Sequence, residues 1–488
     1  MDFSPPGHLR SPDEARAAFA RIAPDLCLLG SDADAARELG RPVQVLGRRL
    51  PNRFCIQPME GWDAESDGSP SPLTLRRWRN FGRSGAALVW GGEAFAIQDE
   101  ARANPRQLFT NPAGDTRGAL SRLLEEVRAG RREVGGDPDD LVIGLQLTHS
   151  GRFARPTPAG AAPVCVDRNP VLAVRQGLSP DHALASDDEL QHLRDAFIES
   201  AALASSVGVD FVDVKCCHGY LLHELLAARL RPGPYGGDLD GRSRLLREIV
   251  AGIRARCPRF PIGVRLSVSD GVPMESDPAR DGVGRPSLRP PGPWLHSFGV
   301  DPEDPERPDP DEPIRLLEAL ASQGVELVNV TLGSPYWCPH LQRPAMRPPS
   351  DGYWPPRDPL HEVVRHLRAT RAIKQRLPWL TVVGSGYSYL QEWLAGVGAH
   401  EIRSGGTDLV GIGRMALSYP EFPLDILAGR TPDRRRLCRT FSDCTSAPRN
   451  GLASGCYPLD PAYRDLPEAA QVRALRPAPP GPGAIRQS

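Results

Sequence analysis

The sequence lacks a charge excess of either sign and lacks any long apolar run. Its 59 lysines and arginines are balanced by 60 aspartates and glutamates. No basic field is available to attract nucleic acid or an anionic membrane, so we expect neither as a partner. No window approaches about 18 uninterrupted apolar residues, which argues against a membrane-spanning helix. Residues 1–30 have no apolar core of the kind found in signal peptides.

Cysteine is also scarce. Ten cysteines without regular spacing in 488 residues do not resemble the framework of a disulfide-rich secreted domain. We therefore expect a reducing, cytoplasmic location. The chain is instead rich in proline, with 52 residues, and the clusters of proline indicate loops.

Short apolar runs alternate with amphipathic helical patterns along the chain. Each run is nearly continuous in apolar residues, as expected of parallel strands covered on both faces. Eight such units in order predict an α/β fold, a (β/α)8 TIM barrel. The predicted strands are 53–59, 86–93, 142–149, 211–218, 262–267, 326–333, 381–386 and 409–414. The predicted helices are 73–83, 115–131, 187–207, 241–256, 313–323, 361–376, 387–396 and 422–428.

The chain is predicted to divide into four segments. They are an N-terminal cap of two helices and a hairpin over 1–50, the barrel over 51–430, an extension packed on the barrel over 431–475, and a disordered tail over 476–488. Two long loops, 269–311 and 334–359, follow the fifth and sixth strands. They leave the rim where barrel enzymes keep their active sites, so we expect them to be functional.

Lysine, histidine and tyrosine gather at the end of the fourth predicted strand. Lys215 lies on the strand, and His218 and Tyr220 follow within one loop. Together they offer two hydrogen-bond donors for a developing oxyanion and one proton source. The alternative is that Lys215 only pairs with Asp213 or Glu93.

Gln146 and Arg265 lie among apolar neighbours on the third and fifth predicted strands. A buried amide needs partners, and Gln146 suits the polar edge of a flat heterocycle. A buried guanidinium needs an anion or a π-system, and a reduced flavin is one candidate for Arg265. The alternatives are a rim hydrogen bond for Gln146 and a buried carboxylate, Glu60 or Glu93, for Arg265.

Glycines end the seventh and eighth predicted strands. Gly384 and Gly386 end the seventh, and Gly411 and Gly413 end the eighth, with Arg414 next. Glycine lets backbone N–H groups approach a phosphate, and a helix N-terminus follows each loop. The sequence therefore predicts a phosphate site at these two loops.

Six motifs, taken together and in order, resemble those of the Old Yellow Enzyme family of FMN-dependent ene-reductases. The resemblance extends over residues 43–430. The motifs are Asn52-Arg53-Phe54-Cys55-Ile56-Gln57-Pro58-Met59, Gln146-x-x-His149-x-Gly151-Arg152, Lys215-x-x-His218-Gly219-Tyr220, Tyr235-Gly236-Gly237 with Arg242 and Arg244, Val264-Arg265-Leu266-Ser267, and Gly411-x-Gly413-Arg414.

The resemblance implies FMN as the cofactor, NADH or NADPH as the reductant, and reduction of a C=C bond conjugated to a carbonyl, carboxylate or thioester. Lys215 and His218 would hold the substrate carbonyl oxygen, and Tyr220 would deliver a proton. Gln146 and Arg265 would bind the pyrimidine edge of the flavin. The other positions implied to contact the cofactor are Pro58, Met59, Glu60 and Gly92, with Gly384, Gly386, Gly413 and Arg414 at its phosphate.

Three departures from the family pattern affect these expectations. Glu60 replaces a small residue, and a carboxylate there disfavours an anionic reduced ring unless it is protonated or paired, for instance with Lys215. Lys215 itself replaces a histidine, and a lysine favours an anionic or enolate-like ligand. Cys438, Cys444 and Cys456 keep part of the cysteine spacing of iron–sulfur relatives. Three thiols cannot hold a four-thiolate cluster, so we expect no cluster and no other metal.

Other functions stay open at this stage. One is an oxidative flavoenzyme on the same fold, of the amine dehydrogenase or demethylase type. A second is a flavin-free lyase that uses Lys215 as a Schiff base. A third is a flavin-binding protein that acts through partners without turnover. The sequence leaves open the small-molecule substrate, the choice of NADH or NADPH, and whether the chain forms a homo-oligomer.

Overall fold

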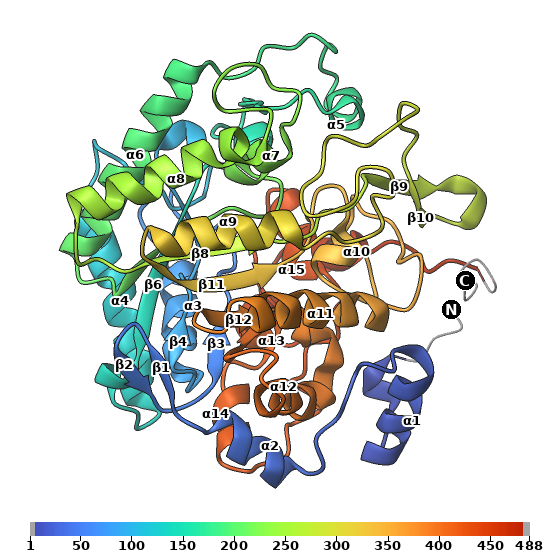
Figure 1. The fold of residues 1–488 in the computed structure, drawn as a ribbon. Coiled ribbons are helices and arrows are strands. Elements are labelled where there is room, and N and C mark those ends of the chain that lie inside the picture. The colour runs from blue at the N-terminus through green and yellow to red at the C-terminus, as the bar shows by residue number, and fades with distance from the viewer. Residues whose placement is uncertain (1–4, 482–488) are drawn as a thin grey trace.

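A closed parallel sheet forms the centre of the computed structural model, which describes residues 5–481 (Figure 1). The strand order is β4-β3-β13-β12-β11-β8-β7-β6-β5, and an additional pairing of β4 with β6 closes the ring. The strands are β3 Phe54–Ile56, β4 Leu88–Val89, β5 Ala94–Ala96, β6 Val142–Thr148, β7 Phe211–Val214, β8 Ile262–Ser267, β11 Val325–Thr331, β12 Thr381–Gly384 and β13 Leu409–Ile412. The predicted (β/α)8 barrel is confirmed.

The second predicted strand differs from the structure, because it is split into β4 and β5. Both pieces pair with β6. Gly91 and Gly92 lie between them, and Gly92 has a φ of +59°. A Cβ at Gly91 would lie 2.7 Å from the backbone nitrogen of Gln146, so glycine permits the close approach of the chain there.

Helices surround the barrel and bury their apolar faces against the strands (Figure 1). They are α3 Pro72–Arg83, α4 Thr116–Glu133, α6 Asp187–Ser206, α8 Leu239–Arg256, α9 Asp311–Ser322, α11 Leu360–Arg376, α12 Leu394–Arg403 and α14 Phe422–Leu427. Side-chain N-caps fix several starts, including a capping box in which Ser186 and Glu189 exchange hydrogen bonds at α6. The seventh helix starts later than predicted, because a 3-10 segment, η6 (Tyr387–Trp393), precedes α12.

The N-terminal segment closes the floor of the barrel. Its elements are α1 Pro12–Ile22, α2 Asp32–Leu39, β1 Val43–Val45 and β2 Arg48–Leu50. The antiparallel pair β1–β2 matches the predicted hairpin. Val43, Val45 and Leu50 pack with side chains at the amino ends of the barrel strands, such as Val142 and Leu409. The opposite, carboxyl end of the barrel is left for the site.

Several short elements, most of them at the rim, were not indicated by the sequence patterns. They are α5 Pro170–Arg175, α7 Leu221–Ala227, the hairpin β9 Met274–Asp277 with β10 Val283–Pro286, α10 Pro339–Gln342 and α13 Arg414–Ser418, together with the 3-10 turns η1 Pro6–His8, η2 Asp99–Ala101, η3 Pro138–Asp140, η4 Gly151–Phe153 and η5 Pro278–Arg280. The β9–β10 hairpin lies in the long loop after the fifth predicted strand. Such short pieces are stabilised by contacts with the structure around them rather than by their own periodicity.

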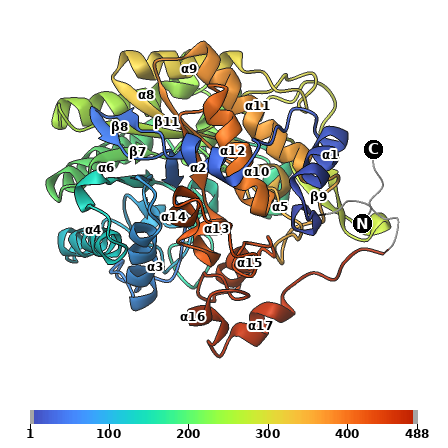
Figure 2. The ribbon, with the colours of Figure 1, turned by 90° about the horizontal axis from the view of Figure 1, so that it is seen from below.

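The C-terminal extension packs beside α3 and α13, as Figure 2 shows. It forms α15 Asp443–Arg449, α16 Pro461–Arg464 and α17 Ala469–Ala474. Arg76 of α3 makes two hydrogen bonds to Asp460, of 2.8 and 2.9 Å. Within the segment predicted to be disordered, residues 476–481 have no helix or strand and residues 482–488 lie outside the described part.

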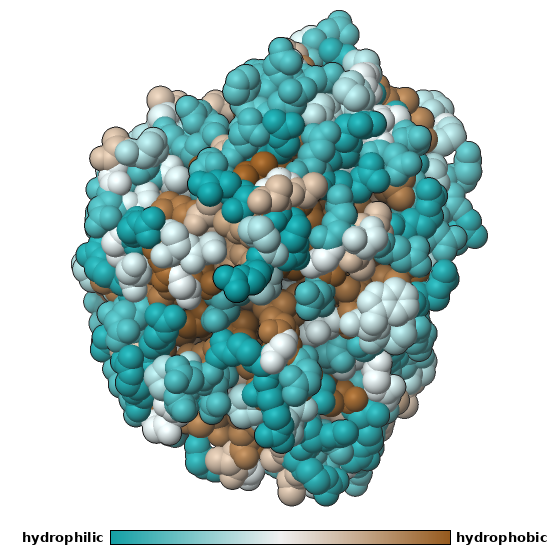
Figure 3. Space-filling view, turned by 60° about the vertical axis from the view of Figure 1, so that its left-hand side comes forward, coloured by the Kyte–Doolittle hydropathy of each residue, from teal (hydrophilic) through white to brown (hydrophobic). Residues whose placement is uncertain are grey.

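Figure 3 shows one face of the molecule, which is largely hydrophilic, with hydrophobic residues gathered in a recessed central band. Across residues 5–481, no helix combines the length and the apolar character that crossing a bilayer requires.

Candidate active site

A cavity opens at the carboxyl end of the barrel, where the strand ends, the long rim loops and the C-terminal extension meet. Eleven of the thirteen residues predicted for the site line it. They are Pro58, Met59, Glu60, Gln146, Lys215, His218, Tyr220, Arg265, Gly386, Gly413 and Arg414. Gly92 and Gly384 do not line it. Their carbonyl oxygens instead accept hydrogen bonds from the Met59 backbone N–H at 2.9 Å and the Gln57 amide at 3.3 Å.

Lys215 forms an ion pair with Glu60 across the cavity. Lys215 Nζ lies 2.5 Å from Glu60 Oε1 and 4.0 Å from the centre of the Tyr220 ring. The side chain of Lys215 is only 2% exposed, so a charged partner and an aromatic face offset the cost of its burial. The structure thus pairs Lys215 with Glu60 rather than with Asp213 or Glu93.

Asp213 and Glu93 have other partners. Asp213 accepts hydrogen bonds from Trp90 Nε1 at 2.7 Å and Gln146 Nε2 at 2.6 Å. Its burial raises its pKa to about 6. Glu93 accepts a hydrogen bond of 2.9 Å from Arg77. Asp213 therefore fixes the Gln146 amide beneath the cavity.

Tyr220 points its hydroxyl at the same carboxylate. Tyr220 Oη donates to Glu60 Oε2 at 2.8 Å and lies 3.1 Å from Tyr336 Oη. Burial and then the negative charge of Glu60 raise the pKa of Tyr220 well above its usual value, so the phenol stays protonated at neutral pH. Tyr336 is held by a stacked contact with Phe153, with ring centres 3.8 Å apart.

His218 lies at the edge of the cavity in a left-handed backbone conformation, with a φ of +66°. Its Nε2 is 3.1 Å from Gln342 Nε2 and 3.5 Å from Thr331 Oγ1. Burial and then the positive charges of Arg265 and Lys215 lower the pKa of His218 well below its usual value. The imidazole is therefore neutral at neutral pH. Because the Gln342 amide nitrogen can only donate, His218 Nε2 accepts that bond.

Arg265 has an incomplete set of partners. Its side chain is buried, Nη1 donates to the Pro58 carbonyl at 3.4 Å, and Nε has no partner among the described residues. No described carboxylate lies within 4.0 Å of its charged nitrogens, so neither Glu60 nor Glu93 neutralises it. A buried cation with a free donor suits a ligand with acceptor atoms or an anionic ring.

Gly386, Gly413 and Arg414 line another part of the cavity. Arg414 Nη2 donates to the Pro344 carbonyl at 2.7 Å, whereas the buried Nη1 has no partner within residues 5–481. A Cβ at Gly413 would meet no atom closer than 3.8 Å, so the backbone there borders open space. Gly386 has a φ of +92°, which glycine adopts without strain. These features suit a phosphate group.

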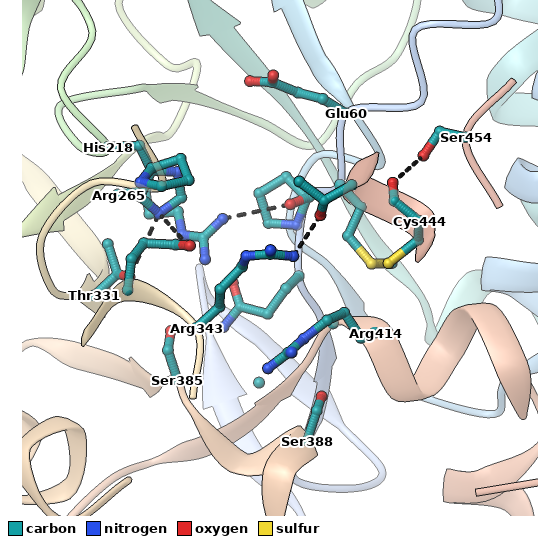
Figure 4. A pocket seen from close by; sticks show the side chains of 18 of the residues that line it. Glu60, His218, Arg265, Thr331, Arg343, Ser385, Ser388, Arg414, Cys444 and Ser454 are labelled. Atoms are coloured by element: carbon teal, nitrogen blue, oxygen red, sulfur yellow. Dashed lines mark hydrogen bonds between the residues drawn. The ribbon is translucent and has the colours of Figure 1, made fainter. Parts of the chain in front are cut away.

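Several residues that line the cavity were not predicted from the sequence. In Figure 4, Arg343 lies between Glu60 and Ser388, and its guanidinium donates to Thr445 of the extension. Arg449 of α15 also lines the cavity. The extension was expected only to pack on the barrel. Contacts between residues about 100 positions apart leave no local pattern that would have revealed them.

Three cysteines of the extension lie together beside this site. Cys438, Cys444 and Cys456 line a small cavity next to Arg414, and all are free thiols. Burial and then the other two thiols raise the pKa of Cys456. Within the described part of the chain, no group of three or more His, Cys, Asp or Glu side chains could hold a metal ion.

Comparison with known proteins gives a consistent family signal. The model of the NADH:flavin oxidoreductase / NADH oxidase family matches residues 38–281. The NADPH dehydrogenase of Bacillus subtilis is 29% identical over 271 residues, which cover 54% of this chain and 72% of that protein. NADH:flavin oxidoreductase FG08077 of Gibberella zeae is 24% identical over 319 residues, covering 62% of this chain and 69% of that protein.

Solved structures share the fold. A morphinone reductase in complex with tetrahydroNAD superimposes with a TM-score of 0.55 at 20% identity, over 82% of this chain and 93% of that one. A 2-naphthoyl-CoA reductase gives a TM-score of 0.65 at 17% identity over 88% of this chain. The present chain spans only 58% of that reductase chain.

Proposed function

Because the chain belongs to the NADH:flavin oxidoreductase / NADH oxidase family, and so is an NAD(P)H:flavin oxidoreductase, we propose that it is an ene-reductase. Its substrate would carry a C=C bond conjugated to a carbonyl, carboxylate or thioester. The observation that supports this most is the convergence of Lys215 and Tyr220 on one side of a cavity that also presents the unsatisfied Arg265.

The residues present fit FMN. Among residues 5–481, Arg265 Nε and Arg414 Nη1 are buried donors without partners that belong to lining residues of one cavity, and the open backbone at Gly413 precedes Arg414. We assign Gln146 and Arg265 to the pyrimidine edge of the ring, and Gly386, Gly413 and Arg414 to the phosphate. Pro58, Met59 and Glu60 would border the ring. Bound FMN supplies the hydride chemistry that no side chain can supply.

The protein's own groups bind and polarise the substrate. Lys215 has three N–H donors, and Glu60 uses one of them, so a substrate carbonyl oxygen can accept from another. His218 would place its neutral ring beside that oxygen. A fixed cation at the position where enolate charge develops lowers the barrier, because the protein needs little reorganisation. Tyr220 would pass a proton to the α-carbon.

One observation favours a second candidate, oxidation of an amine or alcohol in the same cavity. Glu60 accepts the hydrogen bond of Tyr220, which is the arrangement of a base that removes a proton through a phenol. The flavin-free lyase is not favoured, given the family to which the chain belongs.

The test is the visible spectrum of the purified protein under anaerobic conditions. We expect flavin absorbance that bleaches with NADPH or NADH and returns on addition of an enone or enoyl thioester. Bleaching that no conjugated alkene reverses would contradict ene-reduction. If amines or alcohols bleach the oxidised protein instead, the oxidative candidate replaces it.

A further inference from the structure

We propose that Glu60 is the terminal proton donor and acceptor of this site, and that Tyr220 relays the proton between Glu60 and the substrate. This inference rests on the proposed function, in which Tyr220 delivers the proton to the α-carbon. It assigns to Glu60 a catalytic role distinct from bordering the flavin.

Four side chains form one hydrogen-bonded line along the cavity. Lys215 Nζ lies 2.5 Å from Glu60 Oε1, and Tyr220 Oη lies 2.8 Å from Glu60 Oε2. Tyr336 Oη lies 3.1 Å from Tyr220 Oη. Both carboxylate oxygens of Glu60 therefore accept a hydrogen bond from a buried donor, and Glu60 is the link between the cation and the phenol.

While Glu60 is a carboxylate, the donors and acceptors in this line have one order. Because Tyr220 donates its proton to Glu60, the bond between the two phenols must be donated by Tyr336. The line thus runs Tyr336 to Tyr220 to Glu60, and it ends at a carboxylate. In the observed arrangement the Tyr220 proton is directed at Glu60 and not at the open cavity.

Tyr220 is poorly suited to be the terminal proton source. Loss of its proton would leave a phenolate beside a carboxylate in a buried place, which burial and the charge of Glu60 both disfavour. When Glu60 has taken up a proton, it donates to Tyr220 Oη, and transfer through Tyr220 then avoids the phenolate. The O–H bond of Glu60 breaks as a new O–H bond forms on Tyr220, and the original Tyr220 O–H bond breaks as the C–H bond forms at the α-carbon.

The accompanying hydride, which adds to the β-carbon, is supplied by NAD(P)H through the flavin activity of the family. After transfer, Glu60 is a carboxylate paired with Lys215, the arrangement seen in the structure. Glu60 can take up a new proton, because its side chain is 19% exposed, compared with 2% for Lys215. For an oxidation, the same steps run in reverse and Glu60 receives the proton.

The test compares wild type with Glu60→Gln in the half-reaction in which the reduced protein is reoxidised by 2-cyclohexenone and by an enoyl thioester. Glu60 and Tyr220 as the proton source predict opposite changes in the rate of reoxidation. If Glu60 is the proton source, Gln removes it, and reoxidation slows by about 100-fold or more. If Tyr220 is the source, removal of the negative charge makes Tyr220 a stronger acid, and reoxidation is unchanged or faster.

Further readouts separate proton transfer from a structural effect. Ferricyanide removes electrons without protonating carbon, so its reoxidation of Glu60→Gln should slow far less than reoxidation by enones. Glu60→Asp retains a carboxyl group, so it should recover part of the rate of enone reoxidation that Glu60→Gln loses. Tyr336→Phe keeps the stack on Phe153, so it serves as the matched control, with an expected slowing of about 5-fold from one lost hydrogen bond.

The outcomes distinguish the two claims. A Glu60→Gln protein that reduces enones at the wild-type rate overturns the relay and leaves the ene-reductase proposal intact. Equal slowing with ferricyanide and with enones also overturns it, because the effect then lies at the flavin. A wild type whose reduced flavin no enone reoxidises overturns the proposed function, and the relay with it.

Discussion

At the scale of single residues, the cavity is defined by which charges are paired and which are not. Lys215 and Glu60 neutralise each other, whereas Arg265 and Arg414 keep buried donors that no described residue pairs with. A buried donor left unpaired costs roughly 1–3 kcal/mol, so these two arginines mark the places where a ligand would gain most. The paired residues, in turn, are those positioned to move protons.

Tyr220→Phe should separate the two half-reactions. The change removes the hydroxyl that faces Glu60 while keeping the ring beneath Lys215. We expect alkene reduction to slow by about 100- to 10,000-fold and flavin reduction by NAD(P)H to stay within a few-fold of wild type. Anaerobic stopped-flow measurement of each half-reaction checks this, and equal losses in both would contradict a role in proton delivery.

Asp213 should make stability depend on pH in a defined window. Its pKa is raised by burial from 3.8 to about 6, so the folded protein binds the proton more tightly than the unfolded chain. The contribution of this group is therefore fully present below pH 3.8 and is lost as the pH rises through about 6. The loss amounts to up to about 3 kcal/mol.

Asp213→Asn removes this titration. Urea unfolding between these two pH values should give a free energy of unfolding that declines with rising pH in wild type. The variant should lack this decline. Asp188→Asn, an exposed aspartate at the start of α6, is the control and should follow wild type. A variant whose stability falls with pH as steeply as wild type would mean that Asp213 does not titrate in this window.

At the scale of elements, the break between β4 and β5 places the backbone of Gly91 close to Gln146. A methyl group at Gly91 would lie 2.7 Å from Gln146 N and 2.9 Å from Gln146 Cβ, and backbone cannot move aside cheaply. Gly91→Ala should therefore destabilise the protein by about 1–3 kcal/mol and weaken FMN binding by displacing the Gln146 amide.

Urea unfolding and fluorescence titration with FMN measure these two effects. Gly30→Ala is the matched control, because its Cβ would meet only the end of the Asp34 side chain, at 3.2 Å. Unchanged stability of Gly91→Ala would mean that the β4–β5 break tolerates a side chain.

The same scale shows what sequence patterns can and cannot predict. Alternating apolar runs and helical patterns predicted the barrel, since a parallel strand must be apolar on both faces. The pattern could not predict the split at Gly91, which depends on where β6 lies. Nor could the pattern predict that Glu60 and Lys215, which are 155 positions apart, would form an ion pair. The sequence showed only that such a pair would offset the charge of Glu60. Arg343 and Arg449 were missed because long loops and the extension carry no periodicity.

At the scale of the whole molecule, the barrel is closed at one end by the β1–β2 hairpin and left open at the other. An open end lined by unsatisfied cations makes stability depend on the ligand. FMN at about 100 times its Kd should stabilise the folded protein by about 2.7 kcal/mol, visible as a higher Tm. Riboflavin, which lacks the phosphate, should raise the Tm less. Equal shifts for both would contradict a phosphate site at Gly413 and Arg414.

The C-terminal extension also supplies part of the cavity wall, through Cys444, Thr445 and Arg449. During synthesis these residues leave the ribosome only after all eight barrel strands have been made. A nascent chain can therefore close its barrel well before its pocket is finished. The side chains assigned to FMN are all made before the extension, so the wall formed by Cys444, Thr445 and Arg449 is the last part of the cavity to be added.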